Sequence, residues 1–528
     1  MSVNDVIKEG KTFIGIEFGS TRIKAVLIGE DNEPLVAGVH DWQNTLLDGV
    51  WTYPLEEVRA GLQDCFADLM KNVESKYGVK LTKASGMGIS AMMHGYLVFD
   101  KNGEQLVPFR TWRNTMTEEA AAKLTKEFSF NVPQRWSIAH LYQAILKDEE
   151  HIDRIAFMTT LAGYVHTLLT GEKVIGIGDA SGIFPIDSVD GCYNEKMTIR
   201  FDELTQGTRF SAKLIDILPK IVSVGECAGT LTEEGAKILD PTGAFGAGVP
   251  LCPPEGDAQT GMAATNSIAP KTGNVSAGTS IFSMIVLEKA LSAVHREIDI
   301  VTTPCGDPVA MVHCNNCTTD LDAWVKMFGG LLTAAGAETP KGKLYDLIYS
   351  LAEKGAPDCG GIVLYNYYAG EPVTGLDAGK PLMFRSPDSQ FTIENLARSL
   401  VYSCVATLKI GMDILTDEEK VSLERIYAHG GLFKTPVPSQ NILAASLGAD
   451  ITLMESAGEG GAWGIALLAA FMGREDKSQS LSSFLNDKVF KGMNGKTVSP
   501  DPADIEGIRA YMEIYKAGLA AERAASLV

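Results

Sequence analysis

Two stretches of the chain, "GIEFGSTRIKAVLI" (Gly15–Ile28) and "NVSAGTSIFSMIVL" (Asn274–Leu287), share one pattern. Each has a β-rich run, then a glycine followed by two hydroxyl residues, then a second β-rich run. This order is typical of a β-hairpin. The tip of such a hairpin offers backbone N–H groups and hydroxyls, which suit phosphate oxygens.

One such hairpin is also explained by an ordinary turn, because Gly-Ser-Thr and Gly-Thr-Ser are common turn sequences. The two copies lie about half a chain length apart. A chain of two related lobes, each bringing a phosphate hairpin to a shared cleft, explains both copies. We therefore expect two α/β lobes, each with a mixed sheet flanked by helices.

Composition limits the classes of function. With 528 residues, 45% of them hydrophobic, the chain is long enough for two large domains. The formal net charge of −20 argues against nucleic acid or an anionic membrane as a partner. We find no apolar run that suggests a signal peptide or a membrane span. Nine scattered cysteines fit a reduced protein, and we expect a soluble, cytoplasmic one.

In "PEGDAQTGMAATNS" (Pro254–Ser267), Asp257 lies among small residues, with Glu255 as the nearest other charge upstream and none following until Lys271. Asp257 is expected to open a helix, whose N-terminus favours the ionised carboxylate. A helix N-cap is one explanation of this aspartate. A general base with room for a substrate beside it is the other.

Later glycines follow a strand-like run in "IYAHGGLFKTP" and precede an apolar helix in "ESAGEGGAWGIALLAAF". Backbone without side chains lets a flat base lie close, and it also allows tight packing of a helix on a sheet. The tail is expected to end in a helix that covers a sheet, with one apolar face formed by Ile508, Tyr511, Met512 and Tyr515.

Taken together, these stretches resemble the FGGY carbohydrate kinases of the actin-like, hexokinase-like ATPase superfamily. "GIEFGSTRIKAV" resembles the first phosphate motif of that family, "SAGTS" its second and "AHGG" its adenosine motif. "ISAMMHGYLVFDKNGEQLVPFRTWRN" resembles the stretch that lines its sugar pocket, and "GDASG" part of its middle segment. The resemblance covers about residues 12–472. It implies two ribonuclease H-like lobes with a cleft between them, expected at 1–269 and 270–528.

The resemblance also implies a reaction, the transfer of the γ-phosphoryl group of ATP to a sugar hydroxyl with Mg²⁺, and Asp257 as its general base. The sugar-binding residues carried over are Met93, His94, Trp112, Arg113, Asn114 and Asp257. The nucleotide-binding residues carried over are Gly19, Ser20, Thr21, Arg22, Gly278, Thr279, Ser280, Gly430, Gly431 and Asn441. Glu17 is carried over as the metal-site acid. Trp136 and His140 are equally well explained as sugar-pocket residues or as packing.

This chain departs from the family pattern at several positions. Glu17 replaces the usual aspartate, which keeps the charge on a side chain one methylene longer. Met92 replaces a glutamine, and Asn114 replaces the aspartate of a Trp-x-Asp motif. Near the adenosine motif, Asn441 and Ala445 stand where the family has Gln and Asp. These changes leave the sugar open and the reaction class unchanged.

We expect an ATP-dependent kinase that phosphorylates a ketopentose, L-ribulose or D-xylulose, at its terminal hydroxyl to give a pentulose 5-phosphate and ADP. Kinases for glycerol, rhamnulose or fuculose are the alternatives within the family. A non-metabolic actin-like ATPase switch is the alternative from another class. A homodimer stays open, as do the sugar and its stereoisomer.

Overall fold

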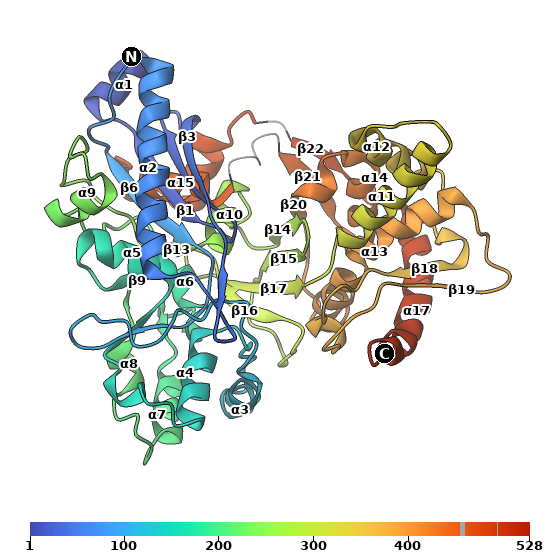
Figure 1. Ribbon diagram of the computed structural model, residues 1–528, viewed down its shortest axis with the longest axis horizontal. Coiled ribbons are helices and arrows are strands. Elements are labelled where there is room, and N and C mark those ends of the chain that lie inside the picture. Colours follow the sequence, from blue (N-terminus) through green and yellow to red (C-terminus); the bar gives the residue numbers. More distant parts are fainter. Residues whose placement is uncertain (455–459, 494) are drawn as a thin grey trace. The chain divides into compact units, whose positions relative to one another are not determined.

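The computed structural model describes residues 1–454, 460–493 and 495–528, without the side chain of Pro436. Contacts divide the chain into two compact units. Unit 1 comprises Met1–Ile268, Ile300–Val309 and Gly458–Gly492. Unit 2 comprises Ala269–Asp299, Ala310–Ala457 and Met493–Val528. Figure 1 shows the strands and helices of both.

Unit 1 is built on a five-stranded mixed sheet in the order β13-β6-β1-β2-β3. Its strands are β1 (Phe13–Phe18), β2 (Arg22–Ile28), β3 (Pro34–Asp41), β6 (Gly86–Ala91) and β13 (Glu255–Gly256). β1 pairs antiparallel with β2 and parallel with β6, and β13 extends the parallel side. β2 carries Ile23, Ala25 and Leu27 into the largest apolar core of the unit.

Two helices cover the opposite faces of this sheet. α2 (Leu55–Tyr77) packs on β2 and β3, where a Cβ on Gly38 would lie 2.5 Å from the Cys65 carbonyl oxygen. α15 (Gly460–Met472) packs on β1 and β6, where a Cβ on Gly15 would lie 2.0 Å from the Ala462 carbonyl oxygen. Glycine is therefore required at both strand positions, because the helices approach the sheet to backbone contact.

The remaining elements of unit 1 are smaller. Its other helices are α1 (Val3–Glu9), α3 (Glu118–Phe128), α4 (Ser137–Leu146), η1 (Ile152–Arg154), α5 (Leu161–Thr170), α6 (Ile177–Ala180), α7 (Glu195–Leu204), α8 (Leu214–Ile217), α9 (Glu233–Leu239), α10 (Asp257–Ala264), α16 (Leu481–Phe484) and η6 (Leu485–Val489). Its other strands are β4 (Thr45–Leu47), β5 (Val50–Thr52), β7 (Leu97–Phe99), β8 (Phe157–Thr159), β9 (Val174–Gly176), β10 (Ile186–Asp187), β11 (Cys192–Tyr193) and β12 (Lys220–Val222).

Unit 2 repeats the central arrangement in a seven-stranded sheet, ordered β16-β17-β15-β14-β20-β21-β22. The strands of this sheet are β14 (Thr272–Ala277), β15 (Ile281–Val286), β16 (Asp299–Thr302), β17 (Pro308–Cys314), β20 (Arg425–His429), β21 (Asp450–Met454) and β22 (Gly495–Val498). Contacts assign β16 after Asp299, and the first two residues of β17, to the 300–309 segment of unit 1. β14 pairs antiparallel with β15 and parallel with β20, as β1 does with β2 and β6. The expectation of a mixed sheet with flanking helices is confirmed for each unit.

The helices of unit 2 lie around this sheet and a smaller one. They are α11 (Thr319–Ala334), α12 (Lys341–Ala352), η2 (Cys359–Gly361), η3 (Pro372–Thr374), α13 (Ile393–Asp413), η4 (Ile414–Glu418), η5 (Gly431–Phe433), α14 (Pro436–Leu447) and α17 (Pro502–Ala525). The smaller sheet pairs β18 (Ile362–Tyr365) with β19 (Leu382–Arg385). Among the described residues one helical stretch, Ile393–Glu418, has the length and apolar composition of a membrane span, and most of it is buried inside the unit.

The predicted lobe ranges 1–269 and 270–528 differ from the contact units in two segments. Residues 300–309 and α15 were expected in the second lobe, and contacts place both in unit 1. For α15 the physical reason is its packing on β1, β6 and α10. For the 300–309 segment it is a set of hydrogen bonds from Thr302 to Ser181, Gln259 and Ile177.

The expected tail helix is confirmed as α17, and Ile508, Tyr511, Met512 and Tyr515 are all buried. It covers β18 of the smaller sheet, where the Tyr365 hydroxyl donates to the Tyr515 carbonyl at 2.8 Å.

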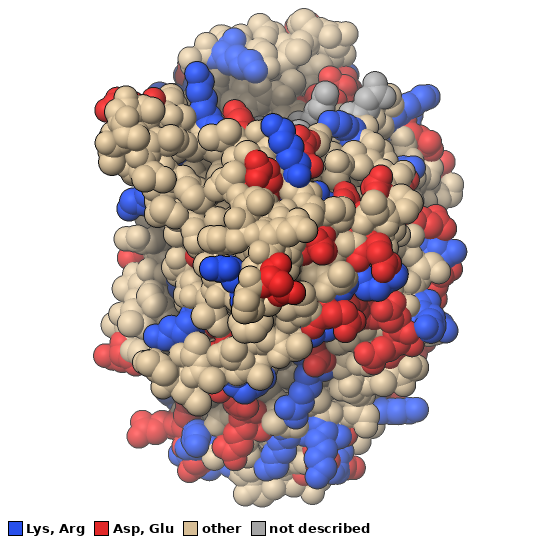
Figure 2. Space-filling model, turned by 90° about the vertical axis from the view of Figure 1, so that its right-hand side faces the viewer, with Lys and Arg blue, Asp and Glu red and all other residues tan. Residues whose placement is uncertain are grey.

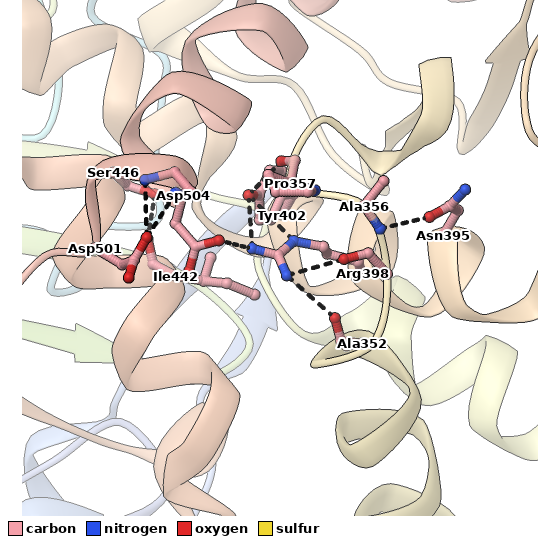
Figure 3. A network of polar contacts seen from close by, with 12 residues as sticks. Ala352, Ala356, Pro357, Asn395, Arg398, Tyr402, Ile442, Ser446, Asp501 and Asp504 are labelled. Atoms are coloured by element: carbon pink, nitrogen blue, oxygen red, sulfur yellow. Dashed lines mark hydrogen bonds and ion pairs between the residues drawn. The ribbon is translucent and has the colours of Figure 1, made fainter.

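A buried ion pair also holds α17. Arg398 on α13 reaches Asp504 on α17, and its guanidinium donates to the Gly355 carbonyl at 3.2 Å (Figure 3). The Tyr402 hydroxyl lies 3.3 Å from the Arg398 Nε and donates to the Pro357 carbonyl. The tail helix is therefore fastened by a charge that is almost excluded from water.

We predict that Asp504→Asn lowers the free energy of unfolding of unit 2 by about 2–3 kcal/mol, because Arg398 stays buried without its counter-charge. The matched control is Glu506→Gln on the same helix, whose carboxylate pairs with Arg509 in solvent. That variant should differ from the parent by less than about 0.5 kcal/mol. Urea denaturation of both variants measures the difference, and equal effects would contradict the role given to the buried pair.

Candidate active site

The first predicted phosphate hairpin is present as the turn between β1 and β2. Phe18 pairs with Ile23, and the tip is Gly19, Ser20 and Thr21. The Gly19 N–H donates to the Arg22 carbonyl at 3.0 Å, which closes the tip. The Arg22 guanidinium is exposed and pairs with Asp41 at 2.7 Å. Arg22 therefore already has a carboxylate partner.

The second hairpin lies between β14 and β15, with Ala277 paired to Ile281 and a tip of Gly278, Thr279 and Ser280. The start of α11 supports it, since the Thr318 N–H and hydroxyl both donate to the Gly278 carbonyl, at 3.1 and 2.8 Å.

The predicted adenosine glycines lie beside the second hairpin. β14 and β20 run parallel with Ser276 opposite His429, so Gly430 follows next to Ala277. Gly430 has φ of 108°, and a Cβ there would lie 2.3 Å from the Ala277 carbonyl oxygen. Only glycine suits that position. A Cβ on Gly431 would meet nothing within 4 Å, which leaves open space beside the backbone.

Asn441 is the remaining nucleotide residue predicted for unit 2. It is half-buried on α14, and this helix packs against η5, which begins at Gly431. The structure therefore gathers the second hairpin and both glycines at neighbouring strand ends and places Asn441 on the next helix.

Asp257 is the first residue of α10, as expected, and the N-cap is Gly256. The explanation of Asp257 as the N-cap is therefore wrong. β13 pairs parallel with β6, with Gly256 opposite Ala91, and this pairing sets the start of α10 beside the end of β6. The Met93 N–H donates to Asp257 Oδ1 at 3.3 Å. Asp257 is half-buried, so a carboxylate held by backbone still reaches solvent.

Met93 and His94 follow β6 in a constrained turn. His94 has φ of 67°, a conformation that non-glycine residues rarely adopt and that is often found at functional sites. Its Nδ1 lies 3.2 Å from the Gly182 carbonyl, which only accepts, so Nδ1 carries the proton. Its ring stacks on Trp136 at a centroid distance of 6.1 Å. The sequence alone could not reveal this link between His94 and the "GDASG" stretch.

Gly182 and Gly256 make room for this turn. A Cβ on Gly182 would lie 2.8 Å from His94 Nδ1, and one on Gly256 would lie 2.3 Å from Met93 Cγ. The predicted sugar residues Met93, His94 and Asp257 are thus brought together in unit 1. Trp136 and His140 are both fully buried, and Trp136 touches this group through His94.

The Trp112–Asn114 segment has a different environment. Asn114 is buried, and its amide is bonded to the backbone of Trp51 and Thr111, at 2.8–3.0 Å. Arg113 is exposed, lies over the Trp51 ring and donates to Asn44. Trp112 is half-buried against the apolar core. The sugar-binding role of the three residues stays a prediction, and Asn114 has a visible structural task.

Glu17 lies on β1 opposite Lys24, and its Oε2 accepts the Ala462 N–H of α15 at 3.2 Å. Any Cβ on Gly461 would lie 2.3 Å from Glu17 Oε1. Burial and repulsion by Asp257 raise the pKa of Glu17 to about 7. Burial raises the pKa of Asp257 to about 6, against a lowering by the Met93 N–H. The two carboxylates thus share one electrostatic environment.

Two further acids, Asp179 and Glu255, were not among the predicted site residues. Glu255 accepts the N–H groups of Gly178 and Asp179 at 3.3 and 2.8 Å, which ties α6 to β13. Asp179 accepts the Thr160 hydroxyl at 2.6 Å. Burial raises the pKa of Asp179 to about 7 and that of Glu255 to about 8, with Asp257 adding to the first and Asp179 to the second. Both acids are visible in the sequence, Asp179 in "GDASG" and Glu255 directly before Gly256. Local sequence does not show that their side chains are buried.

Within 1–454, 460–493 and 495–528, no three His, Cys, Asp or Glu side chains form a metal cage. Glu17 and Asp257 remain as a carboxylate pair. Mg²⁺ commonly keeps waters and takes one or two carboxylates together with substrate phosphates. The donor set of unit 1 therefore fits magnesium that arrives with a nucleotide.

Comparison with known proteins gives two family matches. The model of the FGGY family of carbohydrate kinases, N-terminal domain, matches residues 12–263, and that of the C-terminal domain matches 273–473. A xylulose kinase of Haemophilus influenzae is 22% identical over 475 residues, covering 85% of this chain and 91% of its own. One of Lactococcus lactis is 21% identical over 532 residues, covering 95% of both.

Solved structures of the same kind superpose over nearly the whole chain. Ligand-bound xylulose kinase from Lactobacillus acidophilus has a TM-score of 0.78 at 16% identity, covering 97% of this chain and 99% of its own. The Rhodospirillum rubrum xylulose kinase scores 0.77 at 18%, covering 96% and 98%. Plasmodium falciparum glycerol kinase with ADP scores 0.75 at 16%, covering 98% of both. The predicted α/β fold of two actin-like lobes is confirmed.

The raised pKa of Asp179 gives a prediction about stability and pH. An acid with a raised pKa binds its proton more tightly in the folded state, so its contribution to stability is lost as pH rises from about 4 to about 7. We expect the melting temperature of Asp179→Asn, relative to the parent, to rise from pH 5 to about pH 7 and then to level off towards pH 8 in scanning calorimetry.

The control is Asp240→Asn. Hydrogen bonds from Thr242 and Phe245 lower the pKa of Asp240 despite its burial, so it stays ionised across this window. Its difference from the parent should not change with pH. A flat difference for Asp179→Asn as well would overturn the assignment of a raised pKa.

Proposed function

Because the chain belongs to the FGGY family of carbohydrate kinases, we propose that it transfers the γ-phosphoryl group of ATP to the terminal hydroxyl of a ketopentose. The products are a pentulose 5-phosphate and ADP. The observation that carries this proposal is Asp257, a half-buried carboxylate at the start of α10, held by the Met93 N–H beside His94. A carboxylate in that place is able to accept the proton of an attacking hydroxyl.

In this proposal, unit 1 binds the sugar and accepts the proton, unit 2 binds the base, and both units bind phosphate. In unit 1, Met93 and His94 would bind the sugar, Asp257 would take the proton, and the first hairpin would bind phosphate oxygens. In unit 2, the second hairpin would bind phosphate, and the open backbone at Gly431 would accept the flat base. Phosphoryl transfer depends chiefly on such positioning and on neutralising charge.

Magnesium would neutralise the phosphates when it enters with ATP. Glu17 would hold it, directly or through water, and Asp257 would interact with it electrostatically. An approaching cation would favour the ionised form of both carboxylates, whose pKa values burial has raised. That coupling supports the metal role of Glu17 over a purely structural one.

Xylulose is the first sugar to test, since the two curated relatives and several of the superposed structures carry that name. Ribulose is the second, because the Gly-Gly-Leu sequence at Gly430–Leu432 resembles that of ribulokinases more than the triple glycine of many xylulokinases. A coupled ADP-release assay across ketopentoses, ketohexoses and glycerol identifies the acceptor. ATP turnover that no sugar raises would favour the actin-like switch instead.

The distribution of charged side chains on the surface also agrees with small-molecule substrates. On the face in Figure 2, basic and acidic side chains lie interspersed, acidic ones gather in places, and no continuous basic band crosses it. A polyanion would find no extended site there.

Asp257→Asn should reduce kcat by about 10²–10⁴-fold and leave ATP binding near the parent value, because the amide cannot accept the proton. In the parent, kcat/KM should fall as pH drops below about 6, where Asp257 of the free enzyme takes up a proton. Stopped-time assays of sugar phosphate from pH 5 to 8 and calorimetric ATP titrations give both values. A variant that keeps most of its kcat would remove Asp257 from the base role.

Glu17→Gln should raise the magnesium concentration needed for half-maximal rate several-fold, because the charge is lost while an oxygen still accepts the Ala462 N–H. Glu17→Asp is the matched variant, since it keeps the charge and shortens the reach to Ala462. Glu17→Asp should lower the melting temperature and leave the magnesium concentration for half-maximal rate close to that of the parent. An unchanged magnesium dependence in Glu17→Gln would show that Glu17 serves structure only.

A further inference from the structure

The tip of the first hairpin has all three of its carbonyl groups bonded to donors outside the hairpin. The Gly19 carbonyl accepts the Trp42 indole N–H at 2.7 Å, and the Ser20 carbonyl accepts the Tyr53 hydroxyl at 2.7 Å. The Thr21 carbonyl accepts the backbone N–H of Trp42 at 3.1 Å. Two residues beyond the hairpin therefore fix the direction of every peptide carbonyl at the tip.

Trp42 and Tyr53 form a rigid pair. Their rings stack with centroids 4.2 Å apart, and Phe18 at the end of β1 meets the edge of Trp42 at 5.9 Å. Tyr53 is buried, and burial raises the pKa of its hydroxyl to about 12, so the hydroxyl keeps its proton and donates. Tyr53 follows β5 and Trp42 follows β3, so two separate segments meet at this support.

The amide N–H groups of the tip differ from the carbonyls in their hydrogen bonding. Among the described residues, the Ser20 and Thr21 N–H groups have no hydrogen-bond acceptor in the protein. A carbonyl aimed at a phosphate would repel it, and an amide aimed at it attracts it. Because the tip carbonyls are bonded to the protein, the Ser20 and Thr21 N–H groups are the backbone groups of the tip that can bind a ligand.

The tip carbonyls of the second hairpin are also bonded to donors, two of them from outside the hairpin and one from within the tip. Thr318 donates twice to the Gly278 carbonyl, the Cys317 N–H donates to the Thr279 carbonyl at 3.0 Å, and the Gly278 N–H donates to the Ser280 carbonyl at 2.8 Å. Backbone groups and one threonine do there what two aromatic side chains do at the first tip. Two units that reach the same result differently indicate a functional requirement on the carbonyls.

We propose that Trp42 and Tyr53 are positioning residues for the nucleotide phosphates, which hold the carbonyls of Gly19, Ser20 and Thr21 turned away so that the tip amides bind phosphate oxygens. This inference rests on the proposed function, in which the first hairpin binds ATP. Neither residue touches the nucleotide.

Tyr53→Phe tests it, because only the hydroxyl is removed and the ring stack on Trp42 remains. We expect the dissociation constant for a non-hydrolysable ATP analogue, measured calorimetrically, to rise about two- to tenfold, as for the loss of one hydrogen bond. The sugar KM and the affinity for adenosine should stay at the parent values, since neither ligand uses the tip amides. Trp42→Phe, which removes the indole N–H, should behave in the same way.

Tyr77→Phe is the matched control. The Tyr77 hydroxyl also donates to a backbone carbonyl of unit 1, that of Leu35 at 3.3 Å, on the far end of β3 from Trp42. It should leave analogue binding unchanged. Analogue binding by Tyr53→Phe equal to that of Tyr77→Phe, or an equal weakening for sugar and nucleotide with a lower melting temperature, would overturn the inference. A parent protein that binds no ATP analogue would instead overturn the proposed function.

Discussion

The candidate site of unit 1 depends on the close approach of α15 to β1 and α10. A Cβ on Gly15 would lie 2.0 Å from the Ala462 carbonyl oxygen, and one on Gly464 would lie 1.9 Å from that of Thr260. These glycines let backbone touch backbone, so α15 presents its first N–H groups to Glu17 and supports the helix that Asp257 opens. A larger residue at either position would separate the helix from the sheet and displace both carboxylates.

Burial also raises the pKa values of four carboxylates in unit 1, Asp257, Glu17, Asp179 and Glu255, and repulsion between neighbouring carboxylates adds to three of these shifts. Each accepts at least one N–H or hydroxyl bond, which partly offsets the cost of burial. The group as a whole stays easier to protonate than carboxylates in water. An incoming cation would reverse that balance, so the site is suited to a ligand that brings its own positive charge.

The sequence predicted the features that local pattern controls. Both hairpins, the start of α10 at Asp257 and the buried face of α17 follow from turn glycines, helix signals and apolar spacing, and the structure contains them. It did not predict which sheet α15 would cover, because the sequence of an apolar helix does not show which of two apolar sheets it packs on. The glycines before this helix left two explanations open, contact with a flat base and tight packing on a sheet, and the structure shows close packing at Gly461 and Gly464. Glu255 and the contact of His94 with Gly182 depend on strand pairing between distant segments, which no local pattern shows.

The two units repeat one topology and support it differently. β1 and β14 each pair antiparallel with the next strand and parallel with a later one, and each leads into a three-residue tip. In unit 1 the side chains of Trp42 and Tyr53 and the Trp42 backbone hold the tip carbonyls. In unit 2 Cys317 and Thr318, just before α11, hold two of them, and the Gly278 N–H holds the third. The strand order alone therefore does not set the direction of the tip peptides, since each unit needs extra donors to do so. What the two units share is that every tip carbonyl has a hydrogen-bond donor, and the residues that supply the donors differ.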